Sequence, residues 1–116
     1  MRDERGVVVA VRGAYRGAEL AQQSVTRLGE LGRIASVHPD FAVQVVVHDA
    51  EPADRGVASN LDARRGEAAV RALVAGGANL SRIHAELAGA KIPVADPNDT
   101  RQRERNERLE IVFVGP

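Results

Sequence analysis

The sequence contains no cysteine and no tryptophan. Without cysteine it has no disulfide, no thiol nucleophile and no Cys-ligated zinc or iron. Aromatic residues make up only 3% of the chain, which is too few to stack on single-stranded nucleic acid. The 16 basic side chains are balanced by 16 acidic ones, so the basic excess of a general nucleic-acid binder or of a polybasic membrane anchor is missing.

Long apolar runs are also missing. No stretch approaches the ~20 residues that span a bilayer, so we expect no direct membrane insertion of this chain. Residues 1–6 carry charges and are not followed by an apolar stretch of the ~7–15 residues that a signal peptide requires, which argues against a signal peptide. Two interpretations remain open: a cytoplasmic protein, or a domain excised from a longer exported one. A chain of 116 residues that is 44% hydrophobic predicts one folded domain, residues 1–116.

Strand and helix patterns alternate along the first half of the chain. The apolar, β-branched run at 6–11 predicts a buried strand. Apolar spacings of three and four predict a helix over 18–37, which Pro39 ends and in which Gly29 and Gly32 favour close packing on a sheet. Residues 41–48 predict a second strand. If Gln44 faces outward, Val43, Val45 and Val47 face the core.

The second half continues this alternation. A helix is predicted over 60–75, with Asn60 as its N-cap, followed by strands over 81–87 and 109–114 and a long loop over 89–105 between them. The expected buried side of this helix is Leu61, Ala68, Ala69, Ala72 and Leu73. The order β-α-β-α-β-β predicts an α+β fold. It has a four-stranded mixed sheet, helices packed on one face, a partly solvated other face, and parallel neighbours within each β-α-β unit.

Several short motifs occur in an order that resembles one family. The carriers are Arg82-Ile83, Pro93-Val94-Ala95, Asn98-Asp99-Thr100, Arg103 with Asn106 and Arg108-Leu109-Glu110, and residues 60–70. Together they are similar to the OmpA-like domain, the peptidoglycan-associating domain of OmpA and Pal-type proteins. Asp62, Gly66 and Glu107 depart from the family pattern, so the chain resembles a divergent member.

The resemblance implies non-covalent binding of peptidoglycan through the diaminopimelate of its stem peptide. In the family, an Asp after the second strand and an Arg in the second helix hold the ammonium and the carboxylate of that group. Arg65 matches the family Arg. The chemistry is reasonable, because a guanidinium holds a carboxylate through two parallel hydrogen bonds and a helix N-terminus adds donors. The predicted ligand-binding residues are Arg65, Asp49, Ala50, Asn60 and Leu61.

The position of the acidic partner is left open. Counting back from Arg65 without gaps puts Ala50 where the family has its Asp, whereas a one-residue insertion in the following loop puts Asp49 there. The gapless register keeps Gln44 out of the core and is favoured for that reason. In that register the acidic half of the site is missing or comes from Asp49, Glu51 or Asp54.

The resemblance implies a periplasmic, outer-membrane-associated location, anchored through segments outside this chain. We expect no catalytic residues, no metal site and no cofactor. The three His are scattered along the sequence, and no nucleophile stands at a recognisable spacing from a base. An alternative function remains: an OmpA-like frame that has lost its acidic ligand and serves contacts with envelope proteins or with itself.

Overall fold

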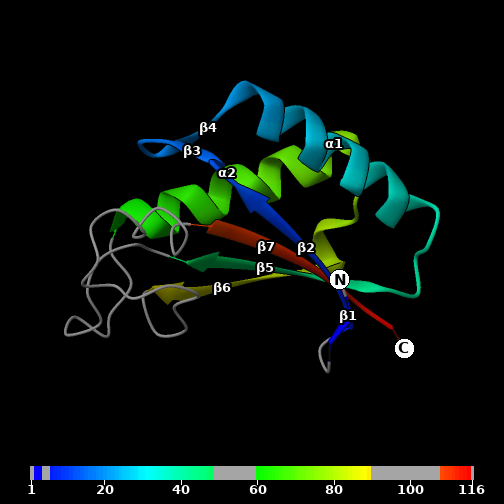
Figure 1. The fold of residues 1–116 in the computed structure, drawn as a ribbon. Helices are drawn as coiled ribbons and strands as arrows, with labels where there is room; N and C mark the ends of the chain where they lie inside the picture. The colour runs from blue at the N-terminus through cyan, green and yellow to red at the C-terminus, as the bar shows by residue number, and fades with distance from the viewer. Residues whose placement is uncertain (1, 4–5, 49–59, 90–107, 116) are drawn as a thin grey trace.

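The computed structural model describes residues 2–3, 6–48, 60–89 and 108–115. Two helices lie side by side over one face of a mixed sheet (Figure 1). The elements in chain order are β1 (Arg2–Asp3), β2 (Gly6–Arg12), β3 (Tyr15–Arg16), β4 (Glu19–Leu20), α1 (Gln22–Ser36), β5 (Ala42–His48), α2 (Asn60–Gly76), a 3-10 turn at Leu80–Arg82, β6 (Ile83–Gly89) and β7 (Arg108–Val114). The predicted α+β class, four main strands and two helices are therefore confirmed.

The sheet has the strand order β1-β2-β7-β5-β6. β5 and β6 are parallel neighbours, as the second β-α-β unit predicts. β7 lies between β2 and β5 and is antiparallel to both, so the expectation that these two strands pair directly is wrong. The last strand of the chain occupies the centre of the sheet, where both of its edges are hydrogen-bonded.

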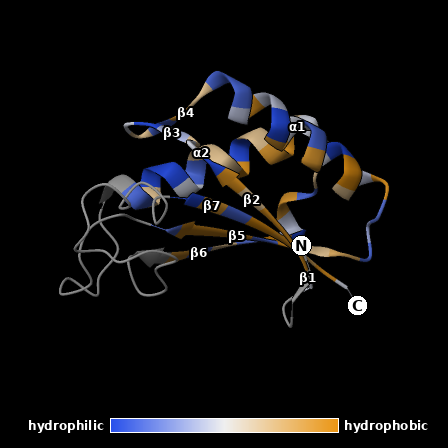
Figure 2. Cartoon of the chain, viewed as in Figure 1, coloured by the Kyte–Doolittle hydropathy of each residue, from blue (hydrophilic) through white to orange (hydrophobic). Residues whose placement is uncertain are grey.

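The main core lies between the helices and the sheet. It takes the inward residues of β5, which are Val43, Val45 and Val47, together with Leu28 of α1 and Leu73 of α2. In Figure 2 the strands are coloured mainly as hydrophobic, whereas both helices mix the two classes. Gln44 points to the opposite face and donates from Nε2 to Glu86 Oε2 at 3.1 Å, so the predicted facing of this strand is confirmed.

The face of the sheet away from the helices is only partly solvated, as predicted. A small apolar cluster of Val8, Val46 and Val112 is buried there, with Val114 packed against it. Toward the β6 edge the same face is polar, because His84 and Glu86 are exposed. The sheet thus has one apolar face under the helices and a mixed face opposite.

Two helix boundaries differ from the prediction. α1 begins at Gln22 rather than at residue 18, because Glu19 and Leu20 pair with Arg16 and Tyr15 in the β3–β4 hairpin. Asn60 was predicted to be the N-cap of α2, but it is the first residue of the helix itself. Ala69, Ala72 and Leu73 are buried as predicted, and Ala68 is half-buried.

The two helices approach each other closely through glycine. A Cβ on Gly32 would overlap the carbonyl oxygen of Leu73, and one on Gly76 would overlap the carbonyl oxygen of Gly29. Both contacts join α1 to α2, so the expectation that the α1 glycines pack on the sheet is wrong. Backbone-to-backbone contact of this kind leaves no room for a side chain.

Candidate functional site

Arg65 lies in the first turns of α2, and its side chain reaches the β3–β4 hairpin. Its Nε donates a hydrogen bond to the carbonyl oxygen of Gly17 at 2.8 Å. Gly17 is the first of the two residues between β3 and β4 and has a φ of +61°. Glycine adopts this backbone conformation without steric cost and is favoured there in type II′ hairpin turns. The turn therefore presents a carbonyl acceptor to Arg65.

Tyr15 of β3 supports the guanidinium from one side. The Arg65 Cζ atom lies 4.2 Å from the centre of the Tyr15 ring, within the range of a cation–π contact. The Tyr15 hydroxyl donates to the carbonyl oxygen of Arg108, the first residue of β7, at 3.2 Å. The short hairpin thus ties together the start of α2 and the start of the central strand, and it fixes the plane of the guanidinium.

Asp62 places a carboxylate one helical turn before Arg65. The distance from its Oδ1 to Arg65 Nη1 is 3.7 Å, which is an ion pair but too long for a hydrogen bond. Asp62 is 1% exposed and Arg65 is 5% exposed. An acidic side chain in the first turn also interacts favourably with the positive end of the helix dipole.

The predicted ligand residues are described to different extents. Arg65 is placed with its side chain, whereas Asn60 and Leu61 are placed only as the first two residues of α2. Asp49 and Ala50 lie outside the described residues, as do Glu51 and Asp54. The inward facing of Val45 and Val47 is what the gapless register requires. The identity of the acidic partner stays a prediction.

Sequence reasoning missed a buried pair on the far face of the sheet. His48 Nε2 lies 2.7 Å from Glu110 Oε1, and the two residues are 1% and 7% exposed. His48 ends β5 and Glu110 lies on β7. The only sequence signal was the parity of His48, which alternates with residues predicted to face the core, whereas no facing was predicted for the strand that carries Glu110. The pair became apparent only once β7 was known to lie beside β5.

Other kinds of site are not indicated in the part of the chain that the structure describes. Residues 2–3, 6–48, 60–89 and 108–115 contain no group of three His, Asp or Glu side chains arranged to hold a metal ion. Within the same ranges no helix is long and apolar enough to cross a membrane.

The whole fold is similar to several solved structures. The periplasmic domain of Helicobacter pylori MotB superposes with a TM-score of 0.76 at 18% identity, covering 97% of this chain and 78% of that one. The peptidoglycan-associated lipoprotein from Burkholderia pseudomallei also gives 0.76, at 22% identity, covering 90% of this chain and 88% of that one. The OmpA-like domain of FopA1 from Francisella tularensis gives 0.72 at 16% identity, covering 93% of this chain and 72% of that one.

This chain has the OmpA-like fold. The likeness that the motifs indicated is thereby confirmed for the fold, and the low identity agrees with a divergent OmpA-like domain. No protein-family model and no curated protein matches the sequence.

Proposed function

We propose that this OmpA-like domain binds peptidoglycan non-covalently and that Arg65 holds the carboxylate of diaminopimelate in the stem peptide. The observation that carries the proposal is the orientation of the guanidinium by Gly17 and Tyr15 at the start of α2. A guanidinium held in one plane loses little side-chain entropy when it binds a carboxylate, so its two parallel hydrogen bonds contribute more fully to affinity. The similar structures support this proposal, since one of them is a peptidoglycan-associated lipoprotein.

A ligand carboxylate must displace a neighbouring group to reach the Arg65 guanidinium, because Arg65 is only 5% exposed. Among the described residues, Asp62 already offers a carboxylate, at 3.7 Å from Arg65 Nη1. A ligand carboxylate at hydrogen-bond distance makes the stronger contact, and it would take the place of Asp62 beside the guanidinium. In this proposal Asp62 acts as an internal competitor that lowers the affinity for peptidoglycan.

The ammonium of diaminopimelate requires an acid. We assign it to the segment that follows β5, where Asp49, Glu51 and Asp54 supply three carboxylates and Ala50 stands at the gapless position. The first residues of α2, Asn60 and Leu61, border the ligand, and backbone donors of the helix N-terminus add to the site. This division of labour matches a zwitterionic amino-acid head.

The proposed role is anchoring and needs no catalysis. The domain would lie in the periplasm and attach a longer envelope protein of the outer membrane to the cell wall. Contacts with other envelope proteins or with a second copy of the chain are compatible with this role.

A second candidate function is a protein-interaction module without peptidoglycan binding. The burial of Arg65 and its contacts with Gly17, Tyr15 and Asp62 favour it, because the same contacts stabilise the fold without a ligand. The two candidate functions differ in whether Arg65 binds peptidoglycan.

Co-sedimentation with purified sacculi separates them. We expect the chain to pellet with diaminopimelate-type sacculi and less with sacculi that carry lysine at that position. Arg65→Lys keeps a cation beside Asp62 but loses the planar fork, so we expect pelleting to fall strongly. Arg64→Ala is the matched control, since Arg64 is an exposed neighbour on the same helix. Circular dichroism checks that each variant is folded.

Equal pelleting of Arg65→Lys and the unaltered chain would remove Arg65 from the site. Failure of the unaltered chain to pellet with either kind of sacculus would favour the interaction module.

A further inference from the structure

The outer edge of α2 and β6 forms an apolar groove of about 400 Å³. Its lining residues are Ala63, Gly66, Glu67, Val70, Arg71, Ala85 and Leu87. β6 is the last strand of the sheet, with β5 on one side and no strand on the other among the residues that the structure describes. A strand edge of this kind offers backbone groups that pair readily with another strand.

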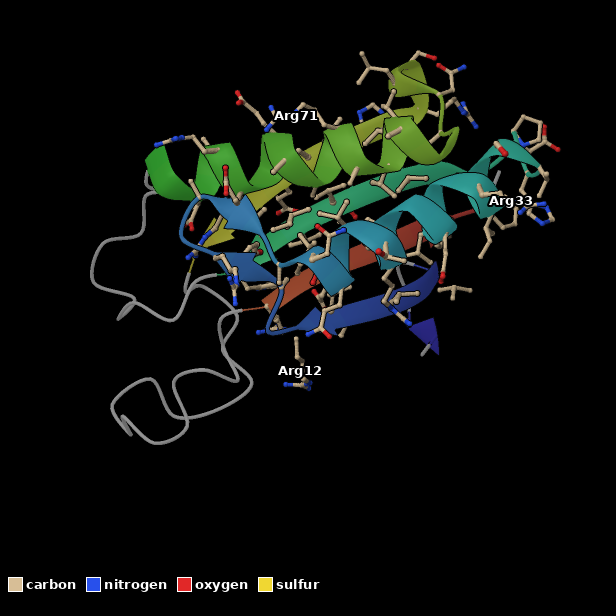
Figure 3. All side chains as sticks on the ribbon, turned by 90° about the horizontal axis from the view of Figure 1, so that it is seen from above. Arg12, Arg33 and Arg71 are labelled. Carbon is tan, nitrogen blue, oxygen red and sulfur yellow. The ribbon has the colours of Figure 1, made fainter. Side chains whose placement is uncertain are left out.

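The helix side of the groove carries small residues and one pair of opposite charges. Ala63, Val70 and Val74 follow one another at helical spacing, and Val74 is 39% exposed although it is apolar. Glu67 and Arg71 lie beside this row and are both exposed. Figure 3 shows Arg71 on the side of α2 that faces away from α1. If a second α2 lay antiparallel across this row, Glu67 of each helix would face Arg71 of the other.

The strand side carries the same kind of self-complementarity. When two copies of a strand pair antiparallel about a two-fold axis, directly opposed residues point to the same face. The axis therefore lies midway between one residue and its own copy, and that residue is used below to name the axis. An axis through His84 or Glu86 would place like residues opposite each other. An axis through Ala85 places His84 opposite Glu86 of the other copy on the polar face, twice, and Ile83 opposite Leu87 on the apolar face. Within Ile83–Gly89, only this central register pairs unlike polar groups, which stabilises cross-strand pairs. An axis through His84 would bring Arg82, just before β6, opposite Glu86, but Arg82 already donates from Nη2 to the carbonyl oxygen of Asp40 at 2.7 Å.

The centre of the proposed helix contact, between Glu67 and Arg71, and the centre of the proposed strand pairing, Ala85, lie at the same height along the groove. A Cβ on Gly66 would be 3.4 Å from Leu87 Cδ2, which places Gly66 over Leu87. Ala85 is two strand residues away, or about 6.6 Å, and an antiparallel helix covers that distance in about four residues. Ala85 therefore lies level with Val70, and both line the groove. The midpoint between Glu67 and Arg71 is one residue from Val70, so a single two-fold axis serves both elements.

We propose that the α2–β6 edge is a symmetric docking surface for a second copy of this chain. The two β6 strands pair antiparallel about Ala85 and join the two sheets into one. The two α2 helices pack antiparallel above that seam, with Glu67 and Arg71 forming reciprocal ion pairs between the copies. The inference rests on the edge geometry and is independent of peptidoglycan binding at Arg65.

Sedimentation velocity over a range of concentrations tests the charge pairing. We expect a monomer–dimer equilibrium in the unaltered chain. In the Arg71→Glu variant, the carboxylate at position 71 of each copy faces Glu67 of the other copy, so two repulsive pairs replace two ion pairs. We expect this variant to raise the dimer dissociation constant at least about tenfold. Adding Glu67→Arg to that variant reverses both charges and is expected to restore the dimer. Both positions of this cycle, Glu67 and Arg71, are exposed, so the monomer fold is preserved.

Cysteine cross-linking tests the register, since the chain has no cysteine of its own. Ala85→Cys places two thiols at the two-fold axis, and we expect mild oxidation to give a disulfide-linked dimer rapidly. Arg33→Cys is the control, because Figure 3 shows Arg33 at the far end of α1 from Arg71. A chain that stays monomeric at all concentrations, a charge-reversed double variant that is no better than Arg71→Glu, or equal cross-linking of both cysteine variants would overturn the proposal.

Discussion

Arg65 Nε donates a hydrogen bond to the carbonyl oxygen of Gly17, 48 residues earlier in the chain, at 2.8 Å. The bond ties the first turns of α2 to the turn between β3 and β4. It also fixes where the proposed ligand-binding guanidinium points, so the geometry of a two-residue turn controls the proposed binding site.

The turn predicts a specific effect of Gly17→Ala. At a φ of +61° an added Cβ meets no atom within 4 Å, so the cost is backbone strain alone, about 1–2 kcal/mol of unfolding free energy. Gly13→Ala is the matched control, with a φ of +60° and equally open space. Urea unfolding should show similar losses for both variants. Only Gly17→Ala should shift the Arg65 Nε–H resonance, and an equal shift in Gly13→Ala would contradict the proposed link.

The helix contact predicts opposite outcomes for two neighbouring glycines. Gly29→Ala adds a Cβ into open space and improves helix propensity, so we expect a gain of up to about 1 kcal/mol. Gly32→Ala forces a Cβ against the carbonyl oxygen of Leu73, and we expect a loss of at least about 1–3 kcal/mol. Thermal unfolding measures both. Stabilisation by Gly32→Ala would show that the helices are farther apart than described.

The buried pair of His48 and Glu110 predicts strong energetic coupling between these two side chains. His48→Leu leaves the Glu110 carboxylate buried without its 2.7 Å partner, and we expect a loss of about 1–3 kcal/mol. The double variant His48→Leu with Glu110→Leu replaces both polar groups by apolar ones and should lose much less than the sum of the two single variants. A double-mutant cycle in urea gives the coupling free energy, and additive losses would show that the two side chains do not interact.

The competition at Arg65 predicts that Asp62→Ser moves stability and affinity in opposite directions. Removing the carboxylate leaves Arg65 buried without that ion pair, so the free energy of unfolding should fall. The same change removes the competing carboxylate, and we expect affinity for diaminopimelate-type sacculi to rise about fivefold, equivalent to about 1 kcal/mol. Affinity that falls together with stability would contradict the role of Asp62 as an internal competitor.

Most elements could be predicted from the sequence because their periodicity reflects burial on one face. The alternation around Gln44 predicted which side of β5 meets the helices, and the spacing that ends at Leu73 predicted the buried side of α2. The start of α1 was placed too early, because Leu20 continues the helical apolar pattern although it pairs with Tyr15 in a hairpin. Local pattern cannot distinguish a short strand pair from the first turn of a helix.

What could not be predicted depends on which strands are neighbours. Nothing local indicates that β7 inserts between β2 and β5, and that insertion is what brings His48 next to Glu110. The contacts of Arg65 with Tyr15 and Gly17 likewise join segments about 50 residues apart. Arg65 itself was singled out by a motif resemblance, whereas the groups that orient it became visible only in the fold.

Titration of the chain with a soluble stem peptide, followed by NMR at the Arg65 Nε–H, tests the central claim most directly. We predict that a peptide containing diaminopimelate shifts this resonance and the Tyr15 ring resonances together, with one saturating curve. The same peptide with lysine in that position should shift them weakly, because it lacks the second carboxylate. Saturable binding that leaves the Arg65 resonance unmoved, or no binding of either peptide, would contradict the account.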